Sequence, residues 1–318
     1  MKVQLRRPCA LPLCVLVAFG AGCSFAPRTA GDLPQIAGSA SRWMATDAVG
    51  RDLLYVSGGE IVEVYTYPRG KLVGLLGTGA DFMCSDKYGY VFMPTAFGGG
   101  VVVYAHGATN PTTSLTDPYF PYACSVDPST RNVAVTGNYG NLVMIFPYNK
   151  KRGWRFGKQH PNSAMRLAAF CGYDKKGNLF VDGTDLNGNF MLAELPKGSS
   201  TYETISVSQA FQKPGGVQWD GNYLTIADFG NGPNSSAAIY RFSISGSTAT
   251  KVSSTRLADS YAGGQFWIEG SRIIGNISHD SVRAIGYWAF PGGGSPMKTF
   301  GSDAPFGVTV SLNSPGKW

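Results

Sequence analysis

The stretch CSVDPSTRNVAVTG, residues 124–137, decides the fold because nearly the same pattern recurs elsewhere in the chain. A short strand-like segment leads into a polar turn opened by Asp127, and a second apolar segment follows. The same order occurs in CSDKYGYVFMPT (residues 84–95) and in CGYDKKGNLFVDG (residues 171–183). Repetition at a nearly fixed period is typical of a fold built from similar units.

An acidic residue before each turn gives the period of the repeat. These acids are 41, 47, 46 and 49 residues apart, and each precedes a short polar turn and an apolar strand. Asp in this place accepts backbone N–H groups across the turn, and a following Gly or Asn tolerates positive φ. We therefore interpret the carboxylates as turn residues. They are Asp86, Asp127, Asp174, Asp220 and Glu269.

Two further strand-like segments complete each repeat. An alternating segment such as GVVVYAH (residues 100–106) comes first, and a more polar one such as MKTFGS (residues 297–302) comes after it. Four strands in about 40 to 50 residues are one blade of a β-propeller. The sequence thus predicts an all-β fold over residues 42–318, a six-bladed β-propeller of four-stranded antiparallel blades.

The two ends of this region are incomplete in complementary ways. The first unit, residues 52–77, lacks an inner strand, and APFGVTVS (residues 304–311) resembles an inner strand with no blade after it. We therefore expect the N- and C-terminal segments to close the ring, which leaves no unpaired sheet edge.

The units resemble NHL repeats. In both PGGVQWDGNYLTIAD (residues 214–228) and residues 171–183, an inner strand leads to an Asp, a turn and an apolar strand. The resemblance covers about residues 42–311 and implies a six-bladed propeller. WD40 repeats have a similar period, but here the Trp219–Asp220 pair lies on an inner strand and no Gly-His pairs recur.

The N-terminus has the features of an export signal. Basic residues precede an apolar run of 11 residues, 9–19, which is too short to span a bilayer. GAGCS (residues 20–24) resembles the lipobox of bacterial lipoproteins, although Gly20 stands where Leu is usual. We expect residues 1–22 to be a signal peptide, Cys23 to carry lipid, and residues 23–41 to form a flexible tether.

The expected location follows from this signal. The protein would be exported and held at the membrane by its N-terminal lipid, as an outer-membrane or cell-surface lipoprotein; otherwise it would be periplasmic or secreted. Ser24 after the cysteine, rather than Asp, favours the outer membrane. Without the basic residues of the signal, the net charge falls from +7 to +4, which is too small to indicate nucleic-acid binding.

The chain has no recognisable catalytic motif. It contains no G-x-S-x-G, H-E-x-x-H, C-x-x-C or phosphate-binding loop, and its three histidines occupy inequivalent places in the repeat. We predict no catalytic residue, no metal site and no cofactor. The histidines are His106, His160 and His279.

The alternative is a lactonase- or hydrolase-like propeller enzyme. Calcium-dependent lactonases share the six-bladed shape and place acidic and amide ligands at inner-strand ends, where this chain has Cys and Trp. Three equivalent cysteines allow at most one bridge and one free thiol; we interpret them as small apolar side chains buried in the core. The residues at these places are Cys84, Cys124, Cys171, Trp219 and Trp267.

One stretch, NKKRGWRFGKQH (residues 149–160), differs from the rest by its cations interleaved with aromatics. This pattern suits an anionic polymer or lipid headgroups. The alternative is a solvated outer edge, where Lys and Arg discourage strand addition. The candidate anionic-ligand residues are Lys150, Lys151, Arg152, Trp154, Arg155, Phe156 and Lys158.

Together these features predict an exported binding or scaffold module at the bacterial cell envelope, whose partner is an envelope protein or a polysaccharide and not a nucleic acid. A structural envelope protein without a small ligand is a further alternative. Fold analogy alone does not identify a ligand.

We predict that the mature protein begins at a lipid-modified Cys23. Mass spectrometry of its N-terminal peptide checks this, and a Cys23→Ala variant should lose membrane association. A free, unmodified N-terminus beyond residue 23 would contradict the prediction.

Overall fold

The structure, a computed structural model, describes residues 42–95, 99–228, 237–260, 264–279, 282–302 and 305–313. The predicted signal peptide, Cys23 and the tether lie outside these residues. Nearly all regular structure in the described part is β-strand, with one short 3-10 helix at Thr46–Ala48. No described helix is long and apolar enough to cross a membrane.

Two sheets consist of four antiparallel strands paired in chain order, as the repeat predicts. The first contains β5 (Cys84–Ser85), β6 (Val91–Thr95), β7 (Gly100–Tyr104) and β8 (Thr113–Thr116). The second contains β9 (Pro121–Val126), β10 (Val133–Gly137), β11 (Leu142–Phe146) and β14 (Lys158–Pro161). A small hairpin of β12 (Tyr148–Asn149) and β13 (Gly153–Trp154) lies in the loop between β11 and β14.

Three further antiparallel sets of four are joined into one twelve-stranded sheet. Their last strands pair in parallel, β18 with β22 and β22 with β26, which the sequence did not predict. The sets are β15 (Met165–Tyr173), β16 (Leu179–Asp185), β17 (Phe190–Leu195) and β18 (Glu203–Val207); β19 (Val217–Trp219), β20 (Leu224–Asp228), β21 (Ala237–Ser245) and β22 (Thr248–Leu257); and β23 (Trp267–Glu269), β24 (Arg272–His279), β25 (Val282–Ala289) and β26 (Gly293–Gly301).

The remaining sheet combines both ends of the described chain. It contains β27 (Val308–Ser311), β2 (Asp52–Ser57), β3 (Val62–Tyr67), β4 (Leu72–Leu76) and, on its outer edge, β1 (Trp43–Met44). β27 pairs antiparallel with β2, in a register that joins Leu53 to Ser311 and Val56 to Val308. The expected pairing of the C-terminal strand with the first unit is therefore present, whereas β1 was not expected.

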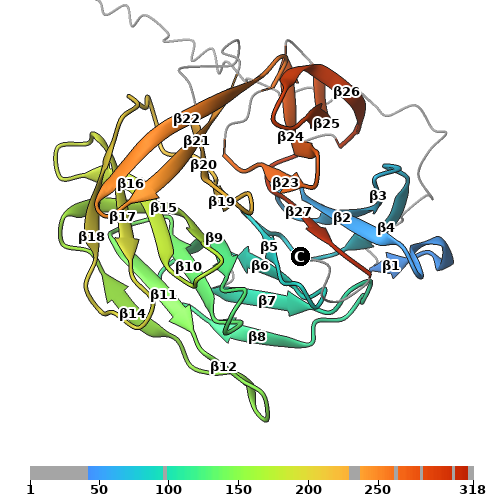
Figure 1. The fold of residues 1–318 in the computed structure, drawn as a ribbon. Helices are drawn as coiled ribbons and strands as arrows, with labels where there is room; N and C mark the ends of the chain where they lie inside the picture. Colours follow the sequence, from blue (N-terminus) through green and yellow to red (C-terminus); the bar gives the residue numbers. More distant parts are fainter. Residues whose placement is uncertain are drawn as a thin grey trace, which may run out of the picture. The chain divides into compact units, whose positions relative to one another are not determined.

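The first strands of the sets contact one another in order. β5 contacts β9, β9 contacts β15, β15 contacts β19, and β27 contacts both β23 and β5. Gln218 joins β19 to β23, because its side-chain amide donates to the carbonyl of Ile268 (3.1 Å) and accepts from its N–H (2.8 Å). Figure 1 shows β5, β19, β23 and β27 toward the middle of this part and β8, β14 and β18 at its periphery.

Polar side chains on the second strands of four sets bind the following set. Each one hydrogen-bonds to backbone at the start of the following set, which satisfies a buried polar group at the junction. The pairs are Ser57 with the carbonyl of Asp81 (2.8 Å), Thr136 with the carbonyl of Ala169 (2.7 Å), Asp182 with the N–H of Gly215 (3.0 Å), and Asn276 with the carbonyl of Phe306 (2.8 Å).

We predict that deleting residues 304–318 destabilises the protein severely. Val308 and Val310 are fully buried, and burial of a Val contributes about 1.5–3 kcal/mol. The deletion also removes the β2–β27 hydrogen bonds, at about 0.5–1.5 kcal/mol each. The sum approaches the whole stability of a domain, about 5–15 kcal/mol.

Differential scanning calorimetry should show a much lower melting temperature or aggregation. Deleting only residues 314–318 is the matched control, because it spares β27, and should change little. An unchanged melting temperature after the longer deletion would contradict the assigned role of β27.

Candidate functional site: a cavity among the strand-to-strand turns

A cavity of about 620 Å³ lies among the first strands of five sets, β5, β9, β15, β19 and β23. It extends to the turns that carry the repeating acids. Because the strands of each set are antiparallel neighbours, the loops between third and fourth strands lie at the same end as these turns. We call this end the cavity face.

The lining of the cavity confirms the inner-strand positions that we predicted from the sequence. All five predicted residues line it: Cys84, Cys124, Cys171, Trp219 and Trp267. Phe170 and Phe266 add further apolar surface, whereas Ser125 and Gln265 add polar groups that the sequence analysis missed.

Aromatic rings fill the space beyond Phe170. The centroid of the Phe82 ring lies 4.7 Å from that of Tyr122, 4.9 Å from that of Phe170 and 4.5 Å from that of Phe306. Burial raises the pKa of Tyr122 to about 12, so its hydroxyl stays neutral at physiological pH. Of these rings, only that of Phe170 lines the cavity, and the others pack behind it.

Two of the three equivalent cysteines form a disulfide, which corrects the expectation that all are buried thiols. Cys84 and Cys124 are bonded, with their Cα atoms 5.6 Å apart. Neighbouring first strands converge here to within the span that a disulfide needs. Cys171 remains a buried free thiol, as expected, and burial raises its pKa. A bridge across 40 residues contributes about 4 kcal/mol on chain-entropy grounds.

The interpretation of the four aspartates as turn residues is confirmed. Each accepts two hydrogen bonds at one carboxylate oxygen from groups of its own turn. Asp86 binds the N–H groups of Tyr88 and Tyr90, Asp127 the N–H and hydroxyl of Ser129, Asp174 the N–H groups of Lys176 and Asn178, and Asp220 those of Asn222 and Tyr223, all at 2.7–2.9 Å.

Glu269 differs from these aspartates. Its carboxylate accepts a hydrogen bond from the indole of Trp267 (3.3 Å). Burial raises its pKa, and the nearby charge of Asp52 raises it further, whereas the indole bond lowers it. Glu269 therefore holds its proton to higher pH than an exposed glutamate does.

The left-handed position of one turn is occupied by an arginine, although Gly or Asn is the residue type expected there. Arg131 has φ of 67°. In the equivalent turn of the next set the position is Gly177, with φ of 90°, and a Cβ there would lie 3.0 Å from a carboxylate oxygen of Asp127. A non-glycine residue in this region costs about 1 kcal/mol or more, so Arg131 must gain compensating contacts.

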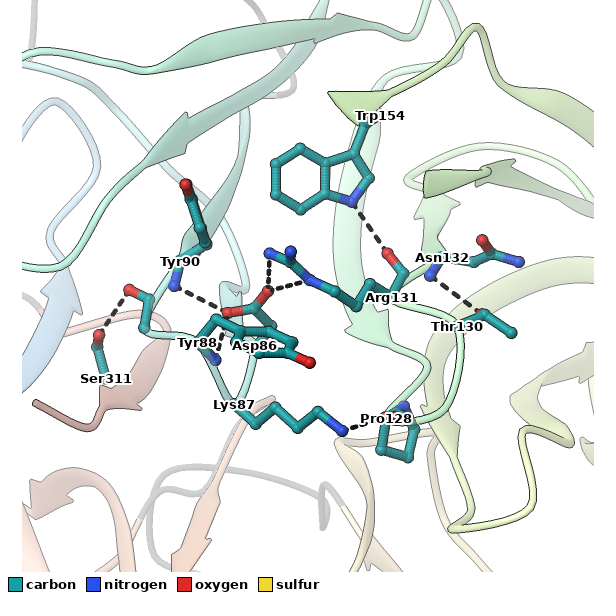
Figure 2. Close-up of polar contacts among 11 residues, drawn as sticks. Asp86, Lys87, Tyr88, Tyr90, Pro128, Thr130, Arg131, Asn132, Trp154 and Ser311 are labelled. Atoms are coloured by element: carbon teal, nitrogen blue, oxygen red, sulfur yellow. Dashed lines mark hydrogen bonds and ion pairs between the residues drawn. The ribbon is translucent and has the colours of Figure 1, made fainter. Parts of the chain in front are cut away.

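An ion pair supplies part of that compensation. The Arg131 guanidinium binds the second oxygen of Asp86 through Nε (3.1 Å) and through a terminal nitrogen (2.6 Å). Figure 2 shows this carboxylate between the guanidinium and its own turn. The Asp86 side chain is only 2% exposed and that of Arg131 15%. The pair therefore joins adjacent sets at the rim of the cavity.

Aromatic rings surround the same guanidinium. Its central carbon lies 4.2 Å from the ring centroid of Tyr88, 4.1 Å from that of Tyr148 and 5.1 Å from that of Trp154. The Trp154 indole donates a hydrogen bond to the carbonyl of Arg131 (3.0 Å; Figure 2). Cation–π contacts of this kind contribute about 0.5–1 kcal/mol each.

The predicted anionic-ligand residues therefore do not form one uniform surface. Trp154 is half-buried against Arg131 and packs on Tyr90, and does not extend outward with the rest. Phe156 is 82% exposed. The cations are all exposed, and none makes an ion pair with another residue that the structure describes. They are Lys150, Lys151, Arg152, Arg155 and Lys158.

The histidines lie in separate places. The two imidazole nitrogens of His106 contact the hydroxyl of Ser311 (2.8 Å) and the carbonyl of Arg51 (2.9 Å). His160 belongs to β14, and burial lowers the pKa of both histidines. The side chain of His279 lies outside the described part. Among the described residues, no group of three or more His, Cys, Asp and Glu side chains could hold a metal ion.

Comparison with known proteins identifies the fold. No protein-family model and no curated protein sequence matches the chain. A chain in the crystal structure of a nidogen/laminin complex is similar at a TM-score of 0.62 and 13% identity, over 83% of this chain and 100% of that one.

Two bacterial proteins of unknown function are also similar. The one from Bacteroides caccae has a TM-score of 0.62 and 11% identity, over 83% of this chain and 100% of that one. The one from Desulfotomaculum acetoxidans has a TM-score of 0.57 and 13% identity, over 87% and 91%. These likenesses show that the protein is a β-propeller. They do not identify its repeat family, so the NHL resemblance stays a prediction.

We predict that Asp86→Asn costs about 2–4 kcal/mol of unfolding free energy, because it leaves Arg131 partly buried without its counter-charge. Asp185→Asn is the matched control. Asp185 accepts backbone N–H bonds from Asn187 and Asn189 and a side-chain bond from Asn189 in an exposed turn, with no cation, and this substitution should cost clearly less than Asp86→Asn.

Urea unfolding measures both values. Adding Arg131→Met to the Asp86→Asn variant should recover part of the loss, since no charge is then left unpaired. Equal costs for the two Asp→Asn variants would show that the ion pair contributes nothing.

Proposed function

We propose that this protein is an exported, lipid-anchored, six-bladed β-propeller with a closed ring that acts as a binding module at the bacterial cell envelope. Its cavity face binds an anionic envelope component, either a polysaccharide or a protein. The observation that carries this function is the imbalance of available charge on that face.

Seven exposed cations lie there, whereas the described acids that do not serve a turn are fewer and include the facing pair Glu194 and Glu203. The cations occupy the loop between β11 and β14, the first position of β14, and the turns that follow β15 and β17, and none forms an ion pair with a described residue. They are Lys150, Lys151, Arg152, Arg155, Lys158, Lys175 and Lys197. The aspartates of the neighbouring turns, Asp86, Asp127 and Asp174, are buried and accept bonds from their own turns.

The closed ring is supported by the strand contacts. β27 pairs with β2 and also contacts β5 and β23, so the last described strand lies between β23 of the last set and β5 of the second set. Gln265 strengthens this junction: its side chain accepts from the N–H of Val308 (3.0 Å) and donates to the carbonyl of Met83. Counting β27 with β2, β3 and β4, these contacts suit six blades.

The Cys84–Cys124 disulfide supports export. Disulfides persist in oxidising compartments such as the periplasm and are rare in the cytosol. The lipobox-like GAGCS at residues 20–24 points to the same compartment. Together they favour a propeller tethered through Cys23 at the envelope. No specific observation favours the lactonase alternative, because the aspartates at the cavity mouth already serve their turns.

We predict that replacing Lys150, Lys151 and Arg152 with Ser weakens binding to an acidic polysaccharide such as alginate about tenfold, since exposed ion pairs contribute up to about 1 kcal/mol each. Binding by the unmodified protein should also weaken with salt, because screening shortens from about 10 Å at 0.1 M to about 3 Å at 1 M. Isothermal titration calorimetry at low and high salt measures both effects.

The matched control is the triple variant of Arg166, Lys213 and Arg283 to Ser. It removes the same charge from exposed residues at the opposite end of the strands, and should retain binding at low salt. Equal affinity of the two triple variants would reject the cavity face as the binding surface.

A further inference from the structure

The cavity wall is mainly apolar and aromatic in its interior. Phe170, Phe266 and Cys171 are buried and line it, with Trp219 and Trp267 nearer the mouth. A volume of about 620 Å³ is within the range of sites for small organic ligands, about 300–1,000 Å³. An aromatic or otherwise flat apolar body fits such a wall.

Some charged side chains at the cavity mouth already have hydrogen-bond or ion-pair partners within the protein, whereas others have donors left for a ligand. The lining aspartates are occupied by their turns, and two also bind arginines: Asp86 with Arg131, and Asp220 with Arg241 (2.7 Å). Lys175 lines the cavity and is exposed, with no ion pair to any described residue. Lys87 uses one donor on the carbonyl of Pro128 (2.8 Å). Glu269, the remaining acid of the lining, lies on β23 and accepts a bond from the Trp267 indole. In the turns after β5 and β15, by contrast, the unused capacity belongs to the cationic donors Lys87 and Lys175.

We propose that the cavity binds a small organic anion, with its apolar ring system against Trp219 and Phe266 and its acidic group at the mouth beside Lys175 and Lys87. This inference rests on the proposed function, in which the cavity face binds anions. It adds that the apolar part of the ligand lies inside the cavity. A polymer with acidic, ring-bearing units would use the cavity and the exposed loop cations together.

Two matched probes separate the apolar from the acidic contribution. Anilinonaphthalene sulfonate has an aromatic body and a sulfonate, whereas phenylnaphthylamine has the same aromatic body and no acid. Fluorescence titration of the folded protein should give tighter binding of the sulfonate. Lys175→Gln should weaken the sulfonate about three- to tenfold, the effect of one partly exposed ion pair, and leave the neutral probe unchanged.

Lys176→Gln is the control for charge. Lys176 is the adjacent exposed residue, does not line the cavity, and lies near Glu194. Burial raises the pKa of Glu194, and the charge of Lys176 opposes that shift. The substitution should leave both probes unchanged. Val217→Trp and Val126→Trp narrow the cavity from two different strands. Each variant that keeps a cooperative melting transition should no longer bind either probe.

The outcomes distinguish the two proposals. Equal affinity for both probes, with no effect of Lys175→Gln, would overturn the anion preference of the cavity. Unchanged binding in the folded Trp variants, or no binding of either probe, would show that the cavity is not a site. Either result leaves the polysaccharide test of the loop cations standing by itself, because that test uses residues outside the cavity.

Discussion

The pairing of β27 with β2 is the interaction on which the rest of the structure depends. The first unit supplies only three strands of its own sheet, and its innermost strand comes from the far end of the chain. Leu54, Val56 and Val310 are buried together with Ile274 and Ile285 of the last set. The core between the first and last sets therefore forms only when both chain ends are in place.

The sequence predicts much of this arrangement because its turns contain residues with a specific hydrogen-bonding role. An Asp that accepts two bonds across a turn fixes where a first strand ends and a second begins, and Asp86, Asp127, Asp174 and Asp220 do so in the structure. The same repeat pattern showed that residues 52–77 lack an inner strand. Local chemistry of this kind can be read without knowledge of distant residues.

Other features depend on contacts between sets and were not predictable. The Cys84–Cys124 bridge requires two first strands to approach within 5.6 Å, and nothing in either repeat specifies that distance. Trp154 was expected on a binding surface because its neighbours are cationic. Its indole instead satisfies a carbonyl at Arg131, in the turn before β10. Asp182 likewise serves the following set through Gly215.

The candidate site shows the same division. Its inner-strand residues were identified from their equivalent places in the repeat. The role of Lys175 was not, because one lysine in a turn of the KKGN type looks like another. Only the structure distinguishes Lys175, which lines the cavity, from Lys176, which does not. The residue types at the rim could be predicted from the sequence. Which of those residues line the cavity could be determined only from the structure.

The parallel pairing of β18 with β22 and of β22 with β26 distinguishes two groups of sheets in the described part. Three consecutive sets are hydrogen-bonded to each other at their outer strands as well as in contact through their inner ones. The sheets ending in β8 and β14 have no such outer link among the described residues. The Cys84–Cys124 disulfide and the Asp86–Arg131 ion pair join these two sheets, whose outer strands are not hydrogen-bonded to each other.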